Sequence, residues 1–217
     1  MQTVISAISQ EPNILKYKHD MGKRRLKPDE RRKQLILCAL KAFAENGVAR
    51  ATHSHVAKLA GVATPTVHSY FRSREDLESA VLDEVENYLI KLVTDSLGGK
   101  QTVEEALTTL ATRFANDATT KSDIIKVWLD WSTGVRAGVW PRYLTLLDKL
   151  HSIARPVFLR GKREGILSEN LNVKAATRLF IGGGHTLALM QFAKVPKRDL
   201  TIYMDQFIQS LMNIGKP

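Results

Sequence analysis

The sequence has few of the features that mark secreted or membrane-spanning proteins. It contains one cysteine, Cys38, so no internal disulfide can form, and a reducing compartment such as the cytoplasm is expected. No apolar run approaches the ~20 residues that a membrane-spanning helix needs. The short apolar stretch at residues 4–8 precedes the basic residues, which is the reverse of a secretory signal. We therefore expect a cytoplasmic protein with no membrane partner.

The sequence also lacks the patterns of an enzyme. Its six histidines, of which His53 and His55 come closest to a metal-ligand spacing, form no ligand cluster. It contains no nucleophile elbow, paired-carboxylate pattern or dinucleotide loop. The glycine run at residues 182–184 has no preceding strand and no following Gly-Lys-Ser/Thr, so it is not a phosphate loop; close helix packing or space for a ligand would explain it. We expect no catalytic residues, no metal and no cofactor.

Positive charge is concentrated in the first third of the chain. The formal net charge is +10, and residues 1–75 hold 14 Lys or Arg against 6 Asp or Glu, whereas the remainder holds 18 against 16. The run Lys23-Arg24-Arg25 lies in this basic third. Two interpretations stay open on charge alone: a local electrostatic footprint for a polyanion, or a solvated basic tail.

Helical periodicity begins after residue 28. Residues 1–22 lack it, and we expect them to form a disordered leader. Pro28 is a plausible helix start, and apolar residues then recur at three- and four-residue spacing until Asn46 and Gly47 end the run. Cys38 falls inside this helix, where a packing role is expected. Met21-Gly22 directly precedes the basic run, so one expectation is that translation begins at Met21 and not at Met1.

Two short helices and a long one come next. Ser54 is the expected N-cap of the first, Gly61 ends it, and Thr64 is the expected N-cap of the second. Ser73 is the expected cap of the long helix, whose apolar stripe continues until the two glycines at residues 98 and 99. Residues 52–71 therefore form a helix-turn-helix.

The rest of the chain also has helical periodicity, and strand-like alternation is absent. Pro156 lies inside one of the expected helices and should kink or divide it. The sequence therefore predicts an all-α fold of about nine helices. The expected helices beyond residue 100 span about 102–118, 122–136, 141–164, 173–193 and 197–213.

The second helix of the helix-turn-helix carries a polar and aromatic outer face without Glu or Lys. A solvated surface helix would more typically use those two residue types. Small hydroxyls and an aromatic ring suit the major groove, where side chains meet base edges, thymine methyls and phosphates. The residues of this face are Thr64, Thr66, His68, Ser69 and Tyr70.

At this point the sequence resembles the TetR family of transcription regulators. The matching segments are ILCALKAFAENG, VAKLAGVATPTVHSYF and SREDLESAVL, and they lie within residues 31–82, about a quarter of the chain. The resemblance implies that the outer face above lies on the DNA recognition helix. It also implies that Thr52 and His53 lie near the DNA backbone, and that Arg74 stands where the family has a phosphate-contacting lysine. His68 departs from the aromatic residue of many members, so base preference cannot be carried over.

A narrower resemblance links residues 126–144, KVWLDWSTGVRAGVWPRYL, to the LuxR/HapR group of quorum-sensing master regulators of vibrios. In that group a short basic arm before the first helix enters the minor groove. The resemblance implies the same role for Lys23, Arg24 and Arg25. A place in a quorum-sensing circuit follows as an expectation. Whether the protein represses or activates depends on operator position and stays open.

The TetR resemblance also implies a ligand cavity among the C-terminal helices. We expect a small apolar ligand, because the candidate lining residues are apolar or aromatic; ordinary core packing is the alternative for each of them. Leu147 and Gly184 stand where the vibrio group has an asparagine and a cysteine, so a different ligand is expected. The candidates are Leu89, Leu92, Val93, Trp128, Trp131, Tyr143, Leu147, Phe180 and Gly184.

A homodimer on a double-stranded DNA operator completes the expected function. One short recognition helix reads few base pairs, and two-fold symmetry doubles the contacts. The expected organisation is a leader at 1–22, a basic arm and DNA-binding domain at 23–75, and a ligand-sensing and dimerisation domain at 76–217. The rival interpretation is a helical adaptor that binds only protein. By resemblance the dimer interface comprises Leu179, Leu187, Met190, Tyr203, Phe207 and Leu211.

Overall fold

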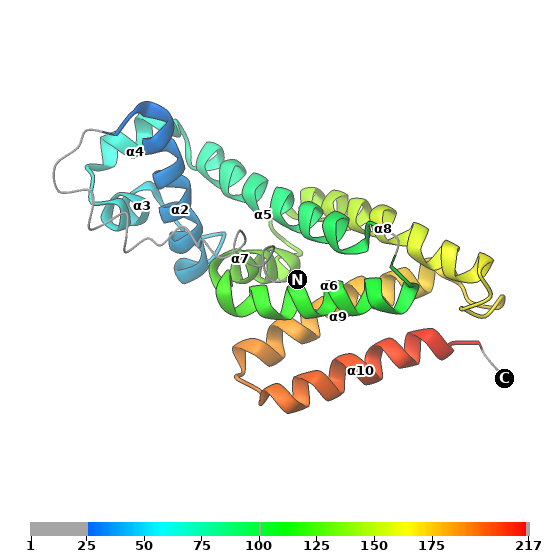
Figure 1. Cartoon of the computed structure of the whole chain (residues 1–217). Coiled ribbons are helices and arrows are strands. Elements are labelled where there is room, and N and C mark those ends of the chain that lie inside the picture. Colours follow the sequence, from blue (N-terminus) through cyan, green and yellow to red (C-terminus); the bar gives the residue numbers. More distant parts are fainter. Residues whose placement is uncertain (1–25, 100, 216–217) are drawn as a thin grey trace.

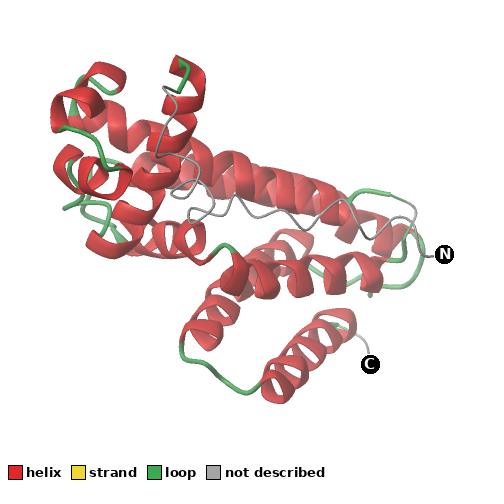
Figure 2. Cartoon of the chain, turned by 60° about the vertical axis from the view of Figure 1, so that its left-hand side comes forward, coloured by secondary structure: helices red, strands yellow, loops and turns green. Residues whose placement is uncertain are grey.

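The computed structural model describes residues 26–99 and 101–215, and within these ranges the chain is built from helices without strands (Figures 1 and 2). The first three helices, of which two are short, gather at one end of the molecule, at the left in Figure 1. We call α2–α4 the head and α5–α10 the body. Lys23, Arg24, Arg25 and the expected leader lie outside the described residues. The expectation of an all-α fold with nine helices is confirmed for the described part of the chain.

The helices of the head are α2 (Pro28–Asn46), α3 (His53–Ala60) and α4 (Thr64–Tyr70). Those of the body are α5 (Arg74–Leu97), α6 (Val103–Thr120), α7 (Ser122–Thr133), α8 (Trp140–Arg163), α9 (Val173–Phe192) and α10 (Lys197–Asn213). No helix of the described residues is both long and apolar enough to cross a membrane.

The N-caps of α3 and α4 correct two of the expectations. Thr52, not Ser54, caps α3: its hydroxyl accepts from the His55 backbone N–H, and the Thr52 N–H donates to His55 Nδ1 at 3.3 Å. Thr64 is the first residue of α4 and follows the N-cap Ala63. Ser73 caps α5 as expected, with its hydroxyl 3.0 Å from the Asp76 N–H. Gly61 ends α3 in the left-handed conformation that glycine tolerates best.

The body helices fall close to their expected ranges, with one difference at Pro156. This residue lies inside α8, which continues as one helix from Trp140 to Arg163. A proline removes one backbone hydrogen bond, and packing on both sides of the lost bond can hold the helix together. On either side of Pro156, the side chains of Ala154, Val157 and Phe158 are buried. Pro156 therefore does not divide the helix.

The head has its own set of fully buried side chains. Phe43 of α2, Val56 of α3 and Val67 of α4 have no exposed surface, and Phe71 is 2% exposed. Cys38 is buried among them on α2, as expected for a packing residue. These contacts hold α3 and α4 at a fixed angle to α2.

Hydrogen bonds join the head to the body at the loop after α2. The Val48 N–H donates to Asp130 Oδ2 on α7 at 2.7 Å, and the Val48 carbonyl accepts from the Arg74 guanidinium at the start of α5. Arg74 also pairs with Glu78 at 2.9 Å. Val48 is thus bonded to α7 through its N–H and to α5 through its carbonyl.

An arginine of α8 fixes α5 within the body. Arg142 contacts Asp83 at 2.6 Å and Glu86 at 2.5 Å, and it donates to the Ser79 hydroxyl at 3.1 Å. All three partners lie on α5. Because the guanidinium bonds three side chains of one helix, it fixes both the position and the rotation of α5 against α8.

Candidate nucleic-acid interface and internal cavity

Helix α4 presents its polar residues to solvent. Val67 is buried, whereas His68 and Ser69 are exposed and Thr66 is half-buried. The Ser69 hydroxyl donates to the Thr66 carbonyl at 2.7 Å. Thr64 and Tyr70 are half-buried on the same helix. The sequence thus places five side chains with hydrogen-bonding groups on α4 around one apolar anchor.

The structure gives His53 a place inside the head. Its side chain is 6% exposed, its Nε2 lies 2.8 Å from the carbonyl oxygen of Phe71, and its ring stacks on His68 with centroids 3.9 Å apart. The buried backbone carbonyl satisfies the polar ring, which disfavours a contact of His53 with the DNA backbone. That contact stays a prediction.

Two other candidates at the edge of the head differ in how accessible their side chains are to DNA. Thr52 is exposed at the N-terminus of α3, where an anion would be favoured. The Arg74 guanidinium is bonded to Val48 and Glu78, so a phosphate contact would compete with these partners. The three residues of the basic arm lie outside the described chain.

The body contains a cavity of about 530 Å³, part of which opens to solvent. Six of the nine candidate residues line it: Leu89, Leu92, Val93, Trp128, Phe180 and Gly184. The lining is completed by Leu110, Ala111, Phe114, Leu150, Ile181, Gly183, Leu187 and Phe207. No charged side chain is among them, so the wall disfavours a charged group inside.

Three candidates lie away from the cavity. Trp131 is buried, and its indole N–H donates to the Val139 carbonyl at 3.0 Å. Tyr143 packs on Trp131 with ring centroids 5.6 Å apart. Leu147 is half-buried beside the core. The two aromatic rings fill the space between α7 and α8, so they belong to the core and not to the cavity wall.

A histidine packs against one residue of this wall. His185 of α9 packs on the cavity residue Trp128 with ring centroids 4.3 Å apart, and its Nε2 lies 2.9 Å from the Ser132 hydroxyl. Burial lowers the pKa of His185 from its usual 6.5, and a backbone hydrogen bond to Gly182 opposes this. The neutral imidazole is therefore the favoured form beside the cavity.

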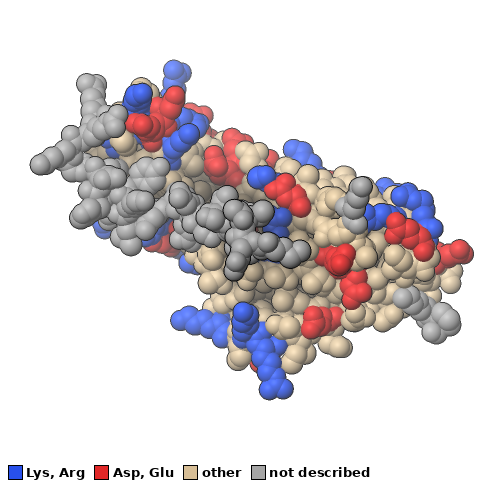
Figure 3. Space-filling view, viewed as in Figure 1, with Lys and Arg blue, Asp and Glu red and all other residues tan. Residues whose placement is uncertain are grey.

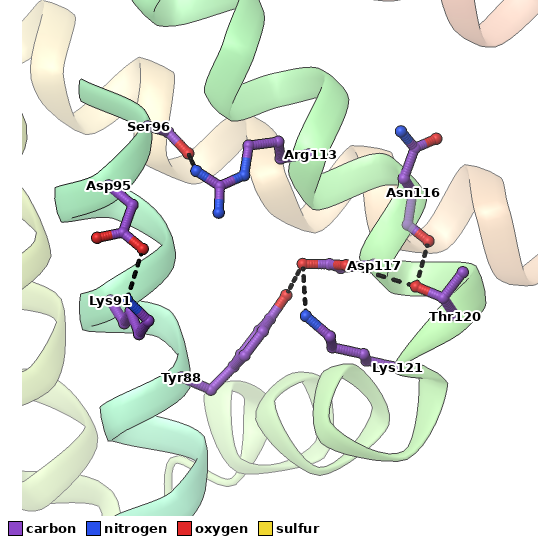
Figure 4. A network of polar contacts seen from close by, with 9 residues as sticks. All are labelled: Tyr88, Lys91, Asp95, Ser96, Arg113, Asn116, Asp117, Thr120 and Lys121. Atoms are coloured by element: carbon purple, nitrogen blue, oxygen red, sulfur yellow. Dashed lines mark hydrogen bonds and ion pairs between the residues drawn. The ribbon is translucent and has the colours of Figure 1, made fainter. Parts of the chain in front are cut away.

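A polar network ties together the two helices that form one side of the cavity (Figure 4). The Tyr88 hydroxyl of α5 donates to Asp117 of α6, which Lys121 also approaches at 3.4 Å. Burial and the hydrogen bond to Asp117 raise the pKa of Tyr88. Arg113 of α6 donates to the Ser96 hydroxyl of α5 at 2.9 Å. These bonds fix the spacing between α5 and α6 and therefore the width of the cavity.

The three glycines of α9 have different surroundings. A Cβ at Gly183 would lie 2.5 Å from the Phe207 ring, whereas one at Gly184 would make ordinary contact with Phe114 and Trp128 at 3.7–3.8 Å. A Cβ at Gly182 would meet nothing within 4 Å. Close helix approach thus explains Gly183, and space beside the cavity explains Gly184.

The six dimer candidates differ in how exposed their side chains are. Leu179 is 54% exposed, whereas Leu187 and Leu211 are buried in their own chain, and Leu187 and Phe207 line the cavity. Met190 and Tyr203 are half-buried, and Tyr203 stacks on Phe207. The apolar residues that α9 and α10 leave exposed are Leu179, Leu189 and Ile202. Figure 3 shows Lys and Arg side chains at the lower edge of the body, where α9 turns into α10. The exposed cations at this turn are Lys194, Lys197 and Arg198.

Comparisons with known proteins agree with this geometry. The family described as bacterial regulatory proteins, tetR family, matches residues 35–81, which span the helix-turn-helix. The fold and this match are like those of DNA-binding transcription regulators. Residues 35–81 therefore match the DNA-binding region of that family, and membership of the whole chain remains a proposal. In the described residues, no group of three or more side chains could hold a metal ion.

Relatives match well beyond the head. The chain is 25% identical to the HTH-type transcriptional regulator LuxR of Vibrio harveyi over 86% of this chain and 91% of the relative. The crystal structure of FadR from Bacillus subtilis, in complex with stearoyl-CoA, is 22% identical with a TM-score of 0.69 over 83% and 97% of the two chains. A cysteine mutant of CifR complexed with 26 bp operator DNA is 17% identical with a TM-score of 0.65 over 86% and 97%. The two structural likenesses show the fold.

Proposed function

We propose that this TetR-family regulator binds a pseudo-palindromic operator as a homodimer and reads bases with the outer face of α4. The exposed His68 and Ser69, held above the buried Val67, carry this proposal. They can meet base edges, while Thr52 and the arm residues Arg24 and Arg25 contact the DNA backbone and the minor groove. The domain division at residue 75 belongs to the same proposal.

The exposed apolar residues of α9 and α10 support the homodimer. Leu179 is 54%, Leu189 56% and Ile202 49% exposed, and large side chains in this state are favoured to pack against a partner. We place the interface on these residues and on Met190 and Tyr203. Leu187, Phe207 and Leu211 support it from within the protomer.

The cavity supports control by a small apolar ligand. Its wall is made of apolar and aromatic side chains, as in most small-molecule sites, and it offers no charged partner. The FadR structure with stearoyl-CoA shows that a protein of this fold accepts a ligand with a long apolar chain. A ligand acts on DNA binding only if it prefers one arrangement of the head over another.

We assign the regulator to cell-density control on the resemblance of residues 126–144 to the vibrio group and the likeness to LuxR of Vibrio harveyi. A deletion strain tests this assignment. Transcripts that change with cell density in the parent should lose that dependence in the deletion. Unchanged density dependence of every transcript would remove the assignment and leave the DNA-binding function intact.

Selection of binding sites from random duplex DNA tests the main proposal. The winning sequence should be pseudo-palindromic, with half-sites about one helical turn apart, and should bind about a thousandfold or more tighter than a scrambled duplex. Arg24→Ala and Arg25→Ala should weaken binding and flatten its salt dependence. No enriched motif would overturn sequence-specific reading and favour the helical adaptor.

A neutral fluorescent hydrophobe, N-phenyl-1-naphthylamine, tests the cavity. Gly184→Leu adds side-chain volume to the cavity wall and should weaken binding of this probe about tenfold. Thr108→Leu adds an equally apolar side chain on the exposed side of α6 and serves as the matched control. Equal probe affinity in both variants would mean that the cavity is not the binding site.

A further inference from the structure

The head contains a pair of stacked histidines that connects its two short helices. His53 is the first residue of α3, and His68 lies on α4. Their ring centroids are 3.9 Å apart and the planes differ by 10°, so the rings overlap face to face. One ring is buried and the other is exposed. The buried His53 ring is thus placed to restrict the orientation of the exposed His68 ring.

The His53 ring is fixed in place by its surroundings. Its Nε2 lies 2.8 Å from the Phe71 carbonyl, and because a carbonyl only accepts, this nitrogen carries the proton. Phe71 is the C-cap residue of α4. The hydrogen bond therefore ties the start of α3 to the end of α4, and burial leaves the ring no alternative rotamer.

The His68 ring has no such bond, and the stack is what orients it. An exposed side chain normally samples several rotamers and loses that freedom on binding. Stacking on a fixed ring holds the imidazole in one plane beforehand. The two ring nitrogens then point in fixed directions, as discrimination between base edges requires.

We infer that His53 is a positioning residue for DNA recognition: it orients the His68 imidazole and thereby sets the base preference at one position of each half-site. This inference rests on the proposed role of α4 in reading DNA. His53 itself touches no base. A merely structural role for His53 would instead weaken binding to all duplexes alike.

Relative affinities for operator duplexes that differ at single base pairs test the inference. The variants are His53→Asn, which keeps a side-chain N–H donor but removes the ring, His68→Ala, and the double variant. His55→Asn is the matched control, because His55 lies on the same helix but bonds to its own N-cap residue. Binding to a scrambled duplex measures the non-specific part for each protein.

His68→Ala should lower discrimination at one base pair by about tenfold, the usual cost of a lost base contact. His53→Asn should lower it at the same base pair by several-fold, and the double variant should match His68→Ala alone. The control should keep wild-type preferences. A loss of affinity in His53→Asn that is the same for every duplex would overturn the inference. So would a His53→Asn substitution that lowers discrimination as much in the His68→Ala protein as in the wild type. Absence of any selected motif in the wild type would instead overturn the proposed function.

Proton NMR of the wild-type protein covers the case in which His53→Asn does not fold. Stacked aromatic rings shield each other's protons, so the His68 ring protons should resonate upfield of those of His55. Ring shifts of His68 equal to those of an unstructured histidine would show that no stack exists in solution and would overturn the inference.

Discussion

The head and the body both enclose apolar side chains, but they place their functional groups differently. The head fills its interior with Phe43, Val56 and Val67 and turns its polar groups outward on α4. The body ties its polar groups into bonds between helices, as at Arg142 and Tyr88, and leaves an apolar cavity inside. The helix-turn-helix is formed by consecutive residues, 52–71. The lining of the cavity, in contrast, comes from residues spread between 89 and 207 of the sequence. The two regions therefore differ in how mutations should affect them.

Phe71→Ala should have the largest effect and should separate the two regions. Phe71 is 2% exposed, and its backbone carbonyl holds His53. Removing a buried aromatic ring costs about 3–5 kcal/mol of stability. Urea unfolding should show this loss, and operator binding should disappear while the body still binds N-phenyl-1-naphthylamine. Loss of probe binding together with operator binding would show that head and body unfold as one unit.

Gly183→Ala and Gly184→Ala should differ by about 2 kcal/mol although they are neighbours. The first must displace the Phe207 ring from a Cβ at 2.5 Å, which costs about 1–3 kcal/mol. The second makes only ordinary contacts. Both variants gain about 0.5–1 kcal/mol of helix propensity, which cancels from the difference. Urea midpoints of both variants measure the difference. Equal midpoints would mean that Phe207 moves freely out of the way.

Asp130→Ala should have a smaller effect, at the junction of the two regions. It removes the acceptor of the Val48 N–H, and the loss should be about 1 kcal/mol because the carboxylate is exposed. Amide hydrogen exchange should become faster at Val48 before it does so in the core of either region. Asp130→Asn, which keeps an acceptor oxygen, should retain most of the protection. Unchanged exchange in Asp130→Ala would show that the bond does not hold the loop.

The pH dependence of stability should change least, and it concerns only the body. Because burial lowers the pKa of His185 in the folded state, its contribution is complete above pH 6.5 and is lost as the pH falls below that value. His185→Asn should reduce the difference in unfolding free energy between pH 7.5 and pH 5.5 by roughly a few tenths of a kcal/mol. His55→Asn in the head is the control. An equal change in both variants would remove the assignment to His185.

The sequence predicted the head better than the body for a physical reason. Helix signals such as Pro28 and Gly61 are local, so the elements of the head follow from short segments. The cap of α3 was misplaced because Thr52 uses His55 where a capping box normally has Glu or Gln. The burial of His53 could not be foreseen, since it depends on a carbonyl 18 residues away.

The cavity shows where a pattern of apolar residues stops being informative. Trp128 and Trp131 are three residues apart on α7 and therefore point only about 60° apart. One faces the cavity and the other the core between α7 and α8, and nothing in their spacing distinguishes the two. Similarly, α9 and α10 are apolar on more than one side. The side of each helix that stays open, marked by Leu189 and Ile202, follows only from the packing of the whole body.

The position of the one cysteine makes the head its own reporter. Cys38 is buried on α2, so a thiol reagent can react with it only when the head opens. The labelling rate of the unmodified protein then measures the opening of this region alone, because the body carries no competing thiol. Added operator DNA should slow that labelling. The factor of slowing reports how much more tightly the DNA binds the closed head than the open head.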